Sequence, residues 1–355
     1  MNRGVGWLIG IVAGVMGIVT FITGMTWPQI HDWFNHDPGN SNSAAAASPE
    51  SETPGRDGTP LDIPLVVRKL GPAPKAVGLA LDPGSGRVYV ASYGLGSLVV
   101  LSETGSEVVA EVKVGSGTAG LALDRSRGLV HLMSVNSGTV STVETDGLSV
   151  VDSTAAGDGR GSIEVDSTTG HVFVVSESRS AIQVVDPGTG GNTWDIPLGV
   201  TPRSLLFDSQ TGRLYVASHD SNEILVVDPS SRSVIRRVSV QGGPAGLAID
   251  SRGNRLLVVS ETSSEVAVLN KDTLSEITRL PVGNEPHGIG VDSGRAVAYV
   301  ANIKDDTLTM LDLERGRVLA TIQGVGNAPE IVVVDEESHR VYVTSWYSGQ
   351  VRVLE

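Results

Sequence analysis

Cysteine is absent from this chain of 355 residues. Its absence excludes disulfide bonds, thiolate metal sites and cysteine nucleophiles. Positive charge is scarce as well, because 26 Lys and Arg stand against 40 Asp and Glu, a formal net charge of −14. Nucleic-acid binding needs clustered Lys and Arg to neutralise phosphates, so we expect no nucleic-acid partner.

Common catalytic and nucleotide-binding motifs are missing too. The sequence has no G-x-S-x-G, no H-E-x-x-H and no P-loop. Residues 115–120, GSGTAG, match G-x-G-x-x-G. They join two predicted strands, however, and no helix follows them to hold a pyrophosphate. The sequence therefore predicts no cofactor.

One long apolar run stands near the N-terminus. Residues 5–27 contain no charged side chain and are long enough to cross a bilayer. Arg3 precedes the run, and Trp27 and Trp33 stand at its far end. Because positive residues stay in the cytoplasm, we expect a signal-anchor helix with residues 1–4 inside. The rest of the chain is then extracytoplasmic, on a single-pass protein of a bacterial cell membrane.

A cleaved signal peptide is the alternative to an anchor. Its apolar core would be about 7–15 residues long, with small residues close behind. Here the small residues 44–47 lie well beyond the apolar run, which favours the anchor. Residues 28–60 are predicted to be a flexible linker, because residues 37–60 are rich in Pro, Gly, Ser and Ala.

An Asp recurs through the rest of the chain at intervals of 42 or 43 residues. Its positions are Asp82, Asp124, Asp166, Asp208, Asp250, Asp292 and Asp335. Around the fourth of these, residues 204–207, 213–218 and 223–227 contain β-branched and aromatic side chains between polar boundaries, and predict strands. A strand repeat of about 40–45 residues is the signature of propeller blades. We therefore predict an all-β, seven-bladed β-propeller of four-stranded blades over residues 61–355.

The two ends of the repeat array complement each other. Residues 63–70, IPLVVRKL, resemble the fourth strand of later repeats, and the chain ends just after the third strand of its last repeat. The N-terminal strand is therefore predicted to complete the last blade, which closes the ring and removes exposed strand edges.

Aligning the repeats on the Asp separates scaffold positions from variable ones. Four residues before it, six repeats have Gly or Ser, which lets the innermost strands approach one another; Ile331 is the exception. Seven residues after it stands a bulky side chain that we expect to pack between blades. These residues are Tyr89, His131, Phe173, Tyr215, Leu257, Tyr299 and Tyr342. His131 is thus interpreted as a packing residue rather than a ligand.

Several of these strands carry a recognisable motif. VYVAS at 88–92, LYVAS at 214–218, AYVAN at 298–302 and VYVTS at 341–345 resemble the YVTN β-propeller repeat family. The resemblance covers residues 63–355. It implies the propeller architecture, and relatives that include surface-layer, exported and lactonase-like proteins, so function has to be argued from a site.

The position five residues before the Asp is a candidate for function, because it varies where the first strand begins. Four repeats have a small or apolar residue there, whereas the other three have Arg203, His287 and Glu330. If the ring closes as predicted, these three side chains lie around the mouth of the central channel. They are the strongest candidates for a ligand site.

The position eleven residues after the Asp lies on the same face of the predicted propeller. Glu177, His219 and Glu261 come from three consecutive repeats, and Tyr93 and Trp346 come from repeats that adjoin once the ring closes. An aromatic wall with carboxylates, histidines and an Arg would suit a small polar or anionic ligand. The two Glu and His219 are also of the right kind for a metal ion, but nothing in their spacing demands one, and no metal is predicted.

Two hypotheses for function follow. The first is a binding or scaffold module for a protein, cell-wall or small-molecule ligand, without catalysis. The second is a lactonase-like hydrolase or lyase, which requires His287 and Glu330 to reach one substrate. A quinone-cofactor dehydrogenase is disfavoured, because Trp194 and Trp346 are the only tryptophans of the predicted propeller. We favour the first hypothesis.

Overall fold

The computed structural model describes residues 54–104, 107–156, 161–187 and 192–355. The predicted cytoplasmic tip and signal-anchor helix, with the linker up to residue 53, lie outside these ranges. Within them, the chain forms no helix that is long and apolar enough to span a membrane.

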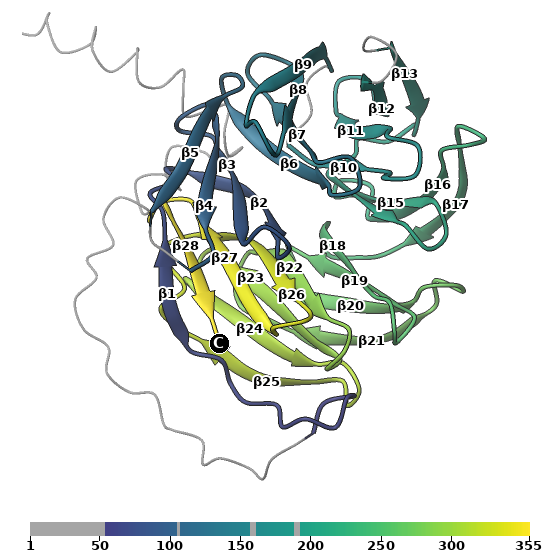
Figure 1. The fold of residues 1–355 in the computed structure, drawn as a ribbon. Coiled ribbons are helices and arrows are strands. Elements are labelled where there is room, and N and C mark those ends of the chain that lie inside the picture. Colours follow the sequence, from purple (N-terminus) through teal and green to yellow (C-terminus); the bar gives the residue numbers. More distant parts are fainter. Residues whose placement is uncertain (1–53, 105–106, 157–160, 188–191) are drawn as a thin grey trace, which may run out of the picture. The chain divides into compact units, whose positions relative to one another are not determined.

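The described part of the chain folds into seven antiparallel sheets of four strands each (Figure 1). The strands are β1 (Val66–Leu70), β2 (Ala76–Asp82), β3 (Arg87–Ser92), β4 (Ser97–Ser102), β5 (Val108–Lys113), β6 (Thr118–Asp124), β7 (Leu129–Ser134), β8 (Thr139–Glu144), β9 (Val150–Ala155), β10 (Ile163–Val165), β11 (Val172–Ser176), β12 (Ala181–Asp186), β13 (Asn192–Pro197), β14 (Ser204–Asp208), β15 (Arg213–Ser218), β16 (Glu223–Asp228), β17 (Ser233–Ser239), β18 (Pro244–Asp250), β19 (Arg255–Ser260), β20 (Glu265–Asn270), β21 (Glu276–Pro281), β22 (Pro286–Asp292), β23 (Val297–Asn302), β24 (Thr307–Asp312), β25 (Arg317–Ile322), β26 (Pro329–Asp335), β27 (Arg340–Ser345) and β28 (Gln350–Leu354). Blades 1 to 6 take four consecutive strands each, starting from β2, and blade 7 consists of β26, β27, β28 and β1. The predicted seven-bladed, four-stranded propeller is confirmed.

The first strand of the fold completes the last blade, as the repeat pattern predicts. β1 pairs antiparallel with β28, from Val66 opposite Leu354 to Leu70 opposite Val351. The strand starts at Val66, three residues later than predicted, although Leu65 and Glu355 still exchange backbone hydrogen bonds of 2.9 and 3.0 Å. The inner strand of each blade contacts that of the next, and β26 contacts β2, so the ring is closed.

Inner strands pack so closely that a side chain would not fit between several of them. A Cβ at Gly246 would clash with the carbonyl oxygen of His287 in the next blade, and one at Gly288 would clash with that of Glu330. In blade 4, where Ser204 occupies the equivalent position, its hydroxyl instead donates to the carbonyl of Ala245. These contacts set the spacing of neighbouring blades at the ring.

The recurring Asp stabilises the turn after each inner strand. In blade 4, Asp208 accepts hydrogen bonds from the backbone N–H of Gln210 (3.0 Å) and the hydroxyl of Thr211 (2.8 Å). Asp166 and Asp335 accept from the backbone N–H two positions further on in the same way. This is the Asx-turn, in which a carboxylate satisfies backbone donors that the turn leaves unpaired. The Asp repeat therefore marks the turn between the first and second strands of each blade.

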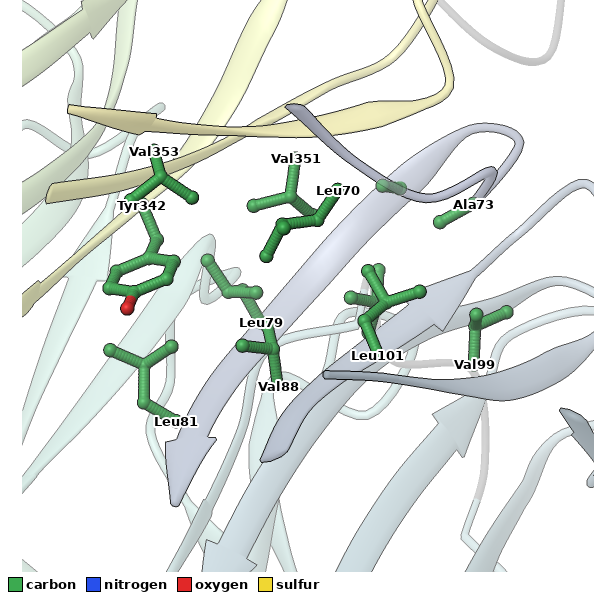
Figure 2. Packing of buried hydrophobic residues seen from close by; sticks show 12 residues of the cluster. Leu70, Ala73, Leu79, Leu81, Val88, Val99, Leu101, Tyr342, Val351 and Val353 are labelled. Atoms are coloured by element: carbon green, nitrogen blue, oxygen red, sulfur yellow. The ribbon is translucent and has the colours of Figure 1, made fainter. Parts of the chain in front are cut away.

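The hydrophobic core lies between blades rather than at one centre. Figure 2 shows the cluster between blades 7 and 1, where Tyr342 packs with Leu79, Leu81 and Val88. Ile331, the exception to the small-residue rule, is partly buried against this same cluster, which gives its size a packing role. The other bulky side chains of the second strands are likewise buried against the following blade.

His131 belongs to this buried layer. Its side chain is 1% exposed, and Nδ1 lies 3.0 Å from the hydroxyl of Thr142. Burial lowers the pKa of His131 to about 4, so the ring is neutral near pH 7. Its place in the fold is that of a packing residue.

Residues 54–60, at the end of the predicted linker, lie against the turns of blades 5 and 6. Arg56 forms a bidentate pair with the buried carboxylate of Asp250, at 2.8 and 2.9 Å. It also donates to Glu314 Oε1 (2.7 Å) and to the carbonyl of Ser293 (2.9 Å). Bidentate pairing to a buried carboxylate is among the stronger electrostatic contacts, so this segment is part of the folded propeller.

The close approach of inner strands gives a test of the ring geometry. We expect Gly288→Ala to lower the free energy of unfolding by roughly 1–3 kcal/mol, because the added methyl must displace the backbone of Glu330. Gly84→Ala is the matched control, since a Cβ there makes only an ordinary contact with Asp82 and removes chain entropy from the unfolded state. Urea unfolding of both variants measures the difference, and equal stabilities would contradict the packing described here.

Candidate functional site

The candidate residues lie on the face of the propeller that carries the connections between blades and the loops between second and third strands, here called the loop face. A backbone hydrogen bond of 3.0 or 3.1 Å recurs in five blades. Its donor is the residue eleven positions after the recurring Asp, and its acceptor is the carbonyl of the residue seven positions before the same Asp. The pairs are Tyr93 to Lys75, Val135 to Gly117, Glu261 to Gly243, Ile303 to Glu285 and Trp346 to Ala328. This repeated bond holds the two loops of each blade together and fixes their side chains on the loop face.

Hydroxyl groups reinforce these loops. The Ser that ends the second strand donates to a backbone carbonyl of the connection entering its blade, as in Ser92 to Pro74 (2.6 Å) and Ser218 to Thr201 (2.8 Å). Both serines are fully buried. The loop face is therefore a rigid support rather than a set of free loops.

Four predicted site residues come together at the start of the inner strands, and we call them the inner-ring cluster. Arg203 Nη2 lies 3.4 Å from His287 Nε2 and 3.5 Å from Glu261 Oε2. His287 Nδ1 lies 3.3 Å from Glu330 Oε2. The four side chains come from blades 4, 5, 6 and 7 and keep 20–29% of their surface exposed. The predicted convergence of Arg203, His287 and Glu330 is thus observed, with Glu261 added to them.

The contacts of His287 define its protonation. Burial lowers the pKa of His287 to about 4, and the positive charge of Arg203 acts in the same direction. A guanidinium only donates hydrogen bonds, so Nε2 of the neutral ring accepts from Arg203 and the ring proton sits on Nδ1. That N–H is next to the carboxyl of Glu330.

Glu330 is shifted in the opposite direction. Burial raises the pKa of Glu330 to about 7, with Glu285 and Glu261 adding to the rise and Arg203 opposing it. The carboxyl therefore titrates much closer to neutral pH than an ordinary glutamate. Glu285 itself is paired with Lys304 at 3.0 Å.

Contacts within the inner-ring cluster are longer than two side-chain contacts that join neighbouring blades. Lys271 and Asp208 approach to 2.9 Å, and His339 and Asp292 approach to 2.7 Å. In the cluster every contact is 3.3–3.5 Å long. Glu261 Oε2 is a buried atom without a hydrogen-bond partner among the described residues, and His287 Nδ1, which also lies near the backbone of Glu330, makes no hydrogen bond there of good geometry. The cluster thus retains hydrogen-bonding capacity that its own contacts leave unused.

Tyr93 and Trp346 form a second group on the loop face. Their ring centroids are 5.5 Å apart with planes tilted by 43°, as the adjoining of blades 1 and 7 predicts. The ammonium of Lys75 lies 5.2 Å from the Trp346 ring and 5.9 Å from the Tyr93 ring. Tyr347, next to Trp346, is close enough to Glu330 for its charge to raise the pKa of the phenol, after the effect of burial. The aromatic group therefore borders the inner-ring cluster.

Glu177 and His219 do not form a metal centre with Glu261. No group of three or more His, Asp or Glu side chains in the described ranges is arranged to hold a metal ion. His219 Nδ1 instead lies 3.0 Å from Asp220, and its ring covers Gly243, where a Cβ would collide with it. Both residues thus remain on the loop face outside the cluster's contacts described above.

Lys75 and Glu285 border the two groups but were not foreseen from the sequence. Both stand seven residues before the Asp, at a position where the backbone is left-handed, with φ of 52° and 51°. The aligned residues Gly117 and Gly243 have the same sign of φ, and glycine is the usual residue there. A large side chain at an aligned position where other blades have glycine was the sequence signal that could have identified both residues.

Comparison with known proteins supports the fold alone. No protein family and no curated protein matches the sequence. Among solved structures, hydrazine synthase of Kuenenia stuttgartiensis superposes with a TM-score of 0.71 at 15% identity, over 80% of this chain and 96% of that one. The β-propeller domain of Myceliophteria thermophila Cps50 (Swd1) gives a TM-score of 0.72 at 8% identity, over 82% and 99% of the two chains. Both confirm the β-propeller architecture.

The raised pKa of Glu330 predicts how stability depends on pH. Because the folded protein binds this proton more tightly than the unfolded chain, whose ordinary value is 4.5, the group stabilises the fold at low pH, and this contribution is lost as pH rises through about 7. Glu330→Gln removes the titration. We expect the variant to match wild type near pH 5 and to be more stable by roughly 2–3 kcal/mol at pH 8.

Urea unfolding at both pH values measures this difference, and the opposite contribution of His287 largely cancels because both proteins retain it. Glu337→Gln changes an exposed carboxyl on a turn and serves as the control. Parallel pH profiles for wild type and Glu330→Gln would show that burial of Glu330 carries no such cost.

Proposed function

We propose that this chain is a membrane-anchored, extracytoplasmic β-propeller of the YVTN kind that binds a small polar ligand at the inner-ring cluster. The anchor and its orientation rest on the uncharged apolar run at 5–27 with Arg3 before it. The family assignment rests on the repeated Tyr-Val-Ala-Ser strands. Binding rests on the cluster itself.

The loose pairing within the inner-ring cluster carries the proposal. Several pairs that join blades are short, such as Lys271 with Asp208 at 2.9 Å, whereas Arg203, His287, Glu261 and Glu330 share contacts of 3.3–3.5 Å and leave hydrogen-bonding capacity unused. Small rotations of the Glu side chains would turn these groups toward a ligand that offers both an acceptor and a donor. A small hydroxy acid or sugar acid has both, and its carboxylate would pair with Arg203.

A lactonase-like hydrolase is the second candidate, favoured by one distance. His287 Nδ1 and Glu330 Oε2 lie 3.3 Å apart, which meets the requirement that both reach one substrate. The pKa of Glu330, about 7, also suits a group that gives and takes protons at neutral pH. In this scheme Glu330 would take a proton from water as the water attacks a lactone carbonyl, and Arg203 would stabilise the developing oxyanion. The protonated Glu330 would then give the proton to the ring oxygen as the ring C–O bond breaks.

A thermal-shift screen of residues 52–355 tests the binding proposal. Small hydroxy acids, sugar acids, lactones, neutral sugars and divalent metal ions are screened against wild type and an Arg203→Ala/His287→Ala double variant. A ligand at one hundred times its Kd adds about 2.7 kcal/mol to stability, enough to raise Tm by several degrees. We expect at least one acid to raise Tm of wild type but not of the double variant.

Two outcomes separate the hypotheses. Hydrolysis of a lactone that wild type performs and both His287→Ala and Glu330→Gln lose would replace binding with catalysis as the function. If no compound shifts wild type, or if the double variant shifts equally, the inner-ring cluster is not a small-molecule site and a scaffold role for a protein or cell-wall partner becomes the better hypothesis.

A further inference from the structure

Blade 6 departs from the repeat at a buried position far along its second strand. Six blades end this strand with Ser, whereas blade 6 has Asn302. The longer side chain is fully buried and makes three hydrogen bonds. Its Oδ1 accepts from the backbone N–H of Gly283 (3.0 Å), and its Nδ2 donates to the hydroxyl oxygens of Thr307 (2.9 Å) and Thr309 (3.0 Å) on β24.

These bonds orient the two threonine hydroxyls. Because each hydroxyl oxygen accepts from Asn302, its own hydrogen is directed away from the amide and is available to donate. Thr307 and Thr309 are only 3% and 2% exposed, yet no acceptor for either hydrogen is found within the described ranges. A hydroxyl hydrogen without an acceptor in the protein is left to donate to solvent or to a bound molecule.

Thr307 and Thr309 are among the residues that line a cavity of about 360 Å³ on the outer part of blade 6. The remaining lining residues are Pro281, Val282, Gly283, Asp305, Val318, Thr321 and Gln323. Thr321 on β25 is the cross-strand partner of Thr309, so side chains from adjacent strands line the same space. Thr321 and Gln323 are exposed, which places the opening at the surface.

The lining selects a class of ligand. It contains hydroxyl and amide groups that both donate and accept, and no Lys or Arg that would pair with an anion. Asp305, its one carboxylate, is held by the backbone N–H and the side-chain amide of Asn284 at 2.7 and 2.9 Å. Val318, 38% exposed, offers an apolar surface for C–H groups.

We propose that this cavity, here called the blade 6 cavity, binds a single neutral sugar ring. Sugar hydroxyls accept from Thr307 and Thr309 and donate to Asp305 or Gln323, while the C–H face of the ring packs on Val318. A volume of about 360 Å³ lies at the lower end of small-molecule sites, which fits one ring rather than an extended chain. None of its lining residues belongs to the inner-ring cluster, so the two sites are independent.

Calorimetric titration of the full chain, in a detergent without a sugar headgroup, tests the proposal. The probes are D-glucose, D-galactose and N-acetyl-D-glucosamine, with D-glucuronate as the anionic comparison. We expect at least one neutral sugar to bind more tightly than D-glucuronate. Thr309→Val, which keeps the side-chain shape but removes the hydroxyl, should weaken that binding about tenfold.

Asn302→Ser is the second variant, because it restores the residue of the other six blades and removes the amide that orients both threonines. It should also weaken sugar binding while Tm shows a folded protein. Thr142→Val is the matched control, since it removes a buried threonine hydroxyl from the third strand of blade 2 and should leave sugar binding unchanged.

The outcomes are decisive in each direction. No neutral sugar binding at tens of millimolar, tighter binding of D-glucuronate, or equal binding by folded wild type and Thr309→Val would each overturn the proposal. Loss of sugar binding in Arg203→Ala/His287→Ala, with Thr309→Val unaffected, would place the sugar at the inner-ring cluster instead. Binding that survives the double variant and fails in Thr309→Val supports the blade 6 cavity, whatever the fate of the function proposed above.

Discussion

Backbone crowding between neighbouring inner strands is the constraint on which the rest of this propeller depends. Where Gly246 and Gly288 stand, the next blade brings a carbonyl oxygen into the space a side chain would fill, and those carbonyls belong to His287 and Glu330. The same contact that sets the spacing of blades thus places two site residues within 3.3 Å of each other. In this ring, close packing and site geometry are one property of the backbone.

Charge serves two purposes on the two faces of the ring. On the turn side, Asp208 with Lys271 and Asp250 with Arg56 form short pairs of 2.8–2.9 Å around buried carboxylates, which join segments distant in sequence. On the loop face, the contacts of the inner-ring cluster are longer. The cluster holds Glu330, whose pKa is about 7, and His287, whose ring is neutral. Short pairs satisfy their charges internally, whereas the longer contacts of the cluster leave hydrogen-bonding capacity unused.

Much of this arrangement was predictable because aligning seven repeats shows which positions are constant and which vary. The Asp spacing predicted the turns, and residues 63–70 predicted the strand that completes the last blade. The aligned variable positions identified Arg203, His287, Glu330 and Glu261 as site candidates. Lys75 and Glu285 were not predicted as neighbours of the site. Their position on the loop face depends on a left-handed backbone conformation, which the sequence indicates only through the aligned glycines of other blades. The packing of residues 54–60 against the propeller was not predicted either, because a Pro- and Gly-rich composition does not indicate that Arg56 pairs with Asp250.

By itself, the sequence determined the number of blades, their order, the way the ring closes and which positions vary, because all of these follow from period and alternation along the chain. Only the tertiary structure decided which variable side chains meet. Glu261 joins Arg203 while His219 turns to Asp220, although both occupy the same aligned position. Which of the two residues contacts Arg203 depends on distances between blades. The blade 6 cavity likewise forms only when β24 and β25 pack beside the end of β21. Contacts of this kind depend on three-dimensional packing, which no local pattern records.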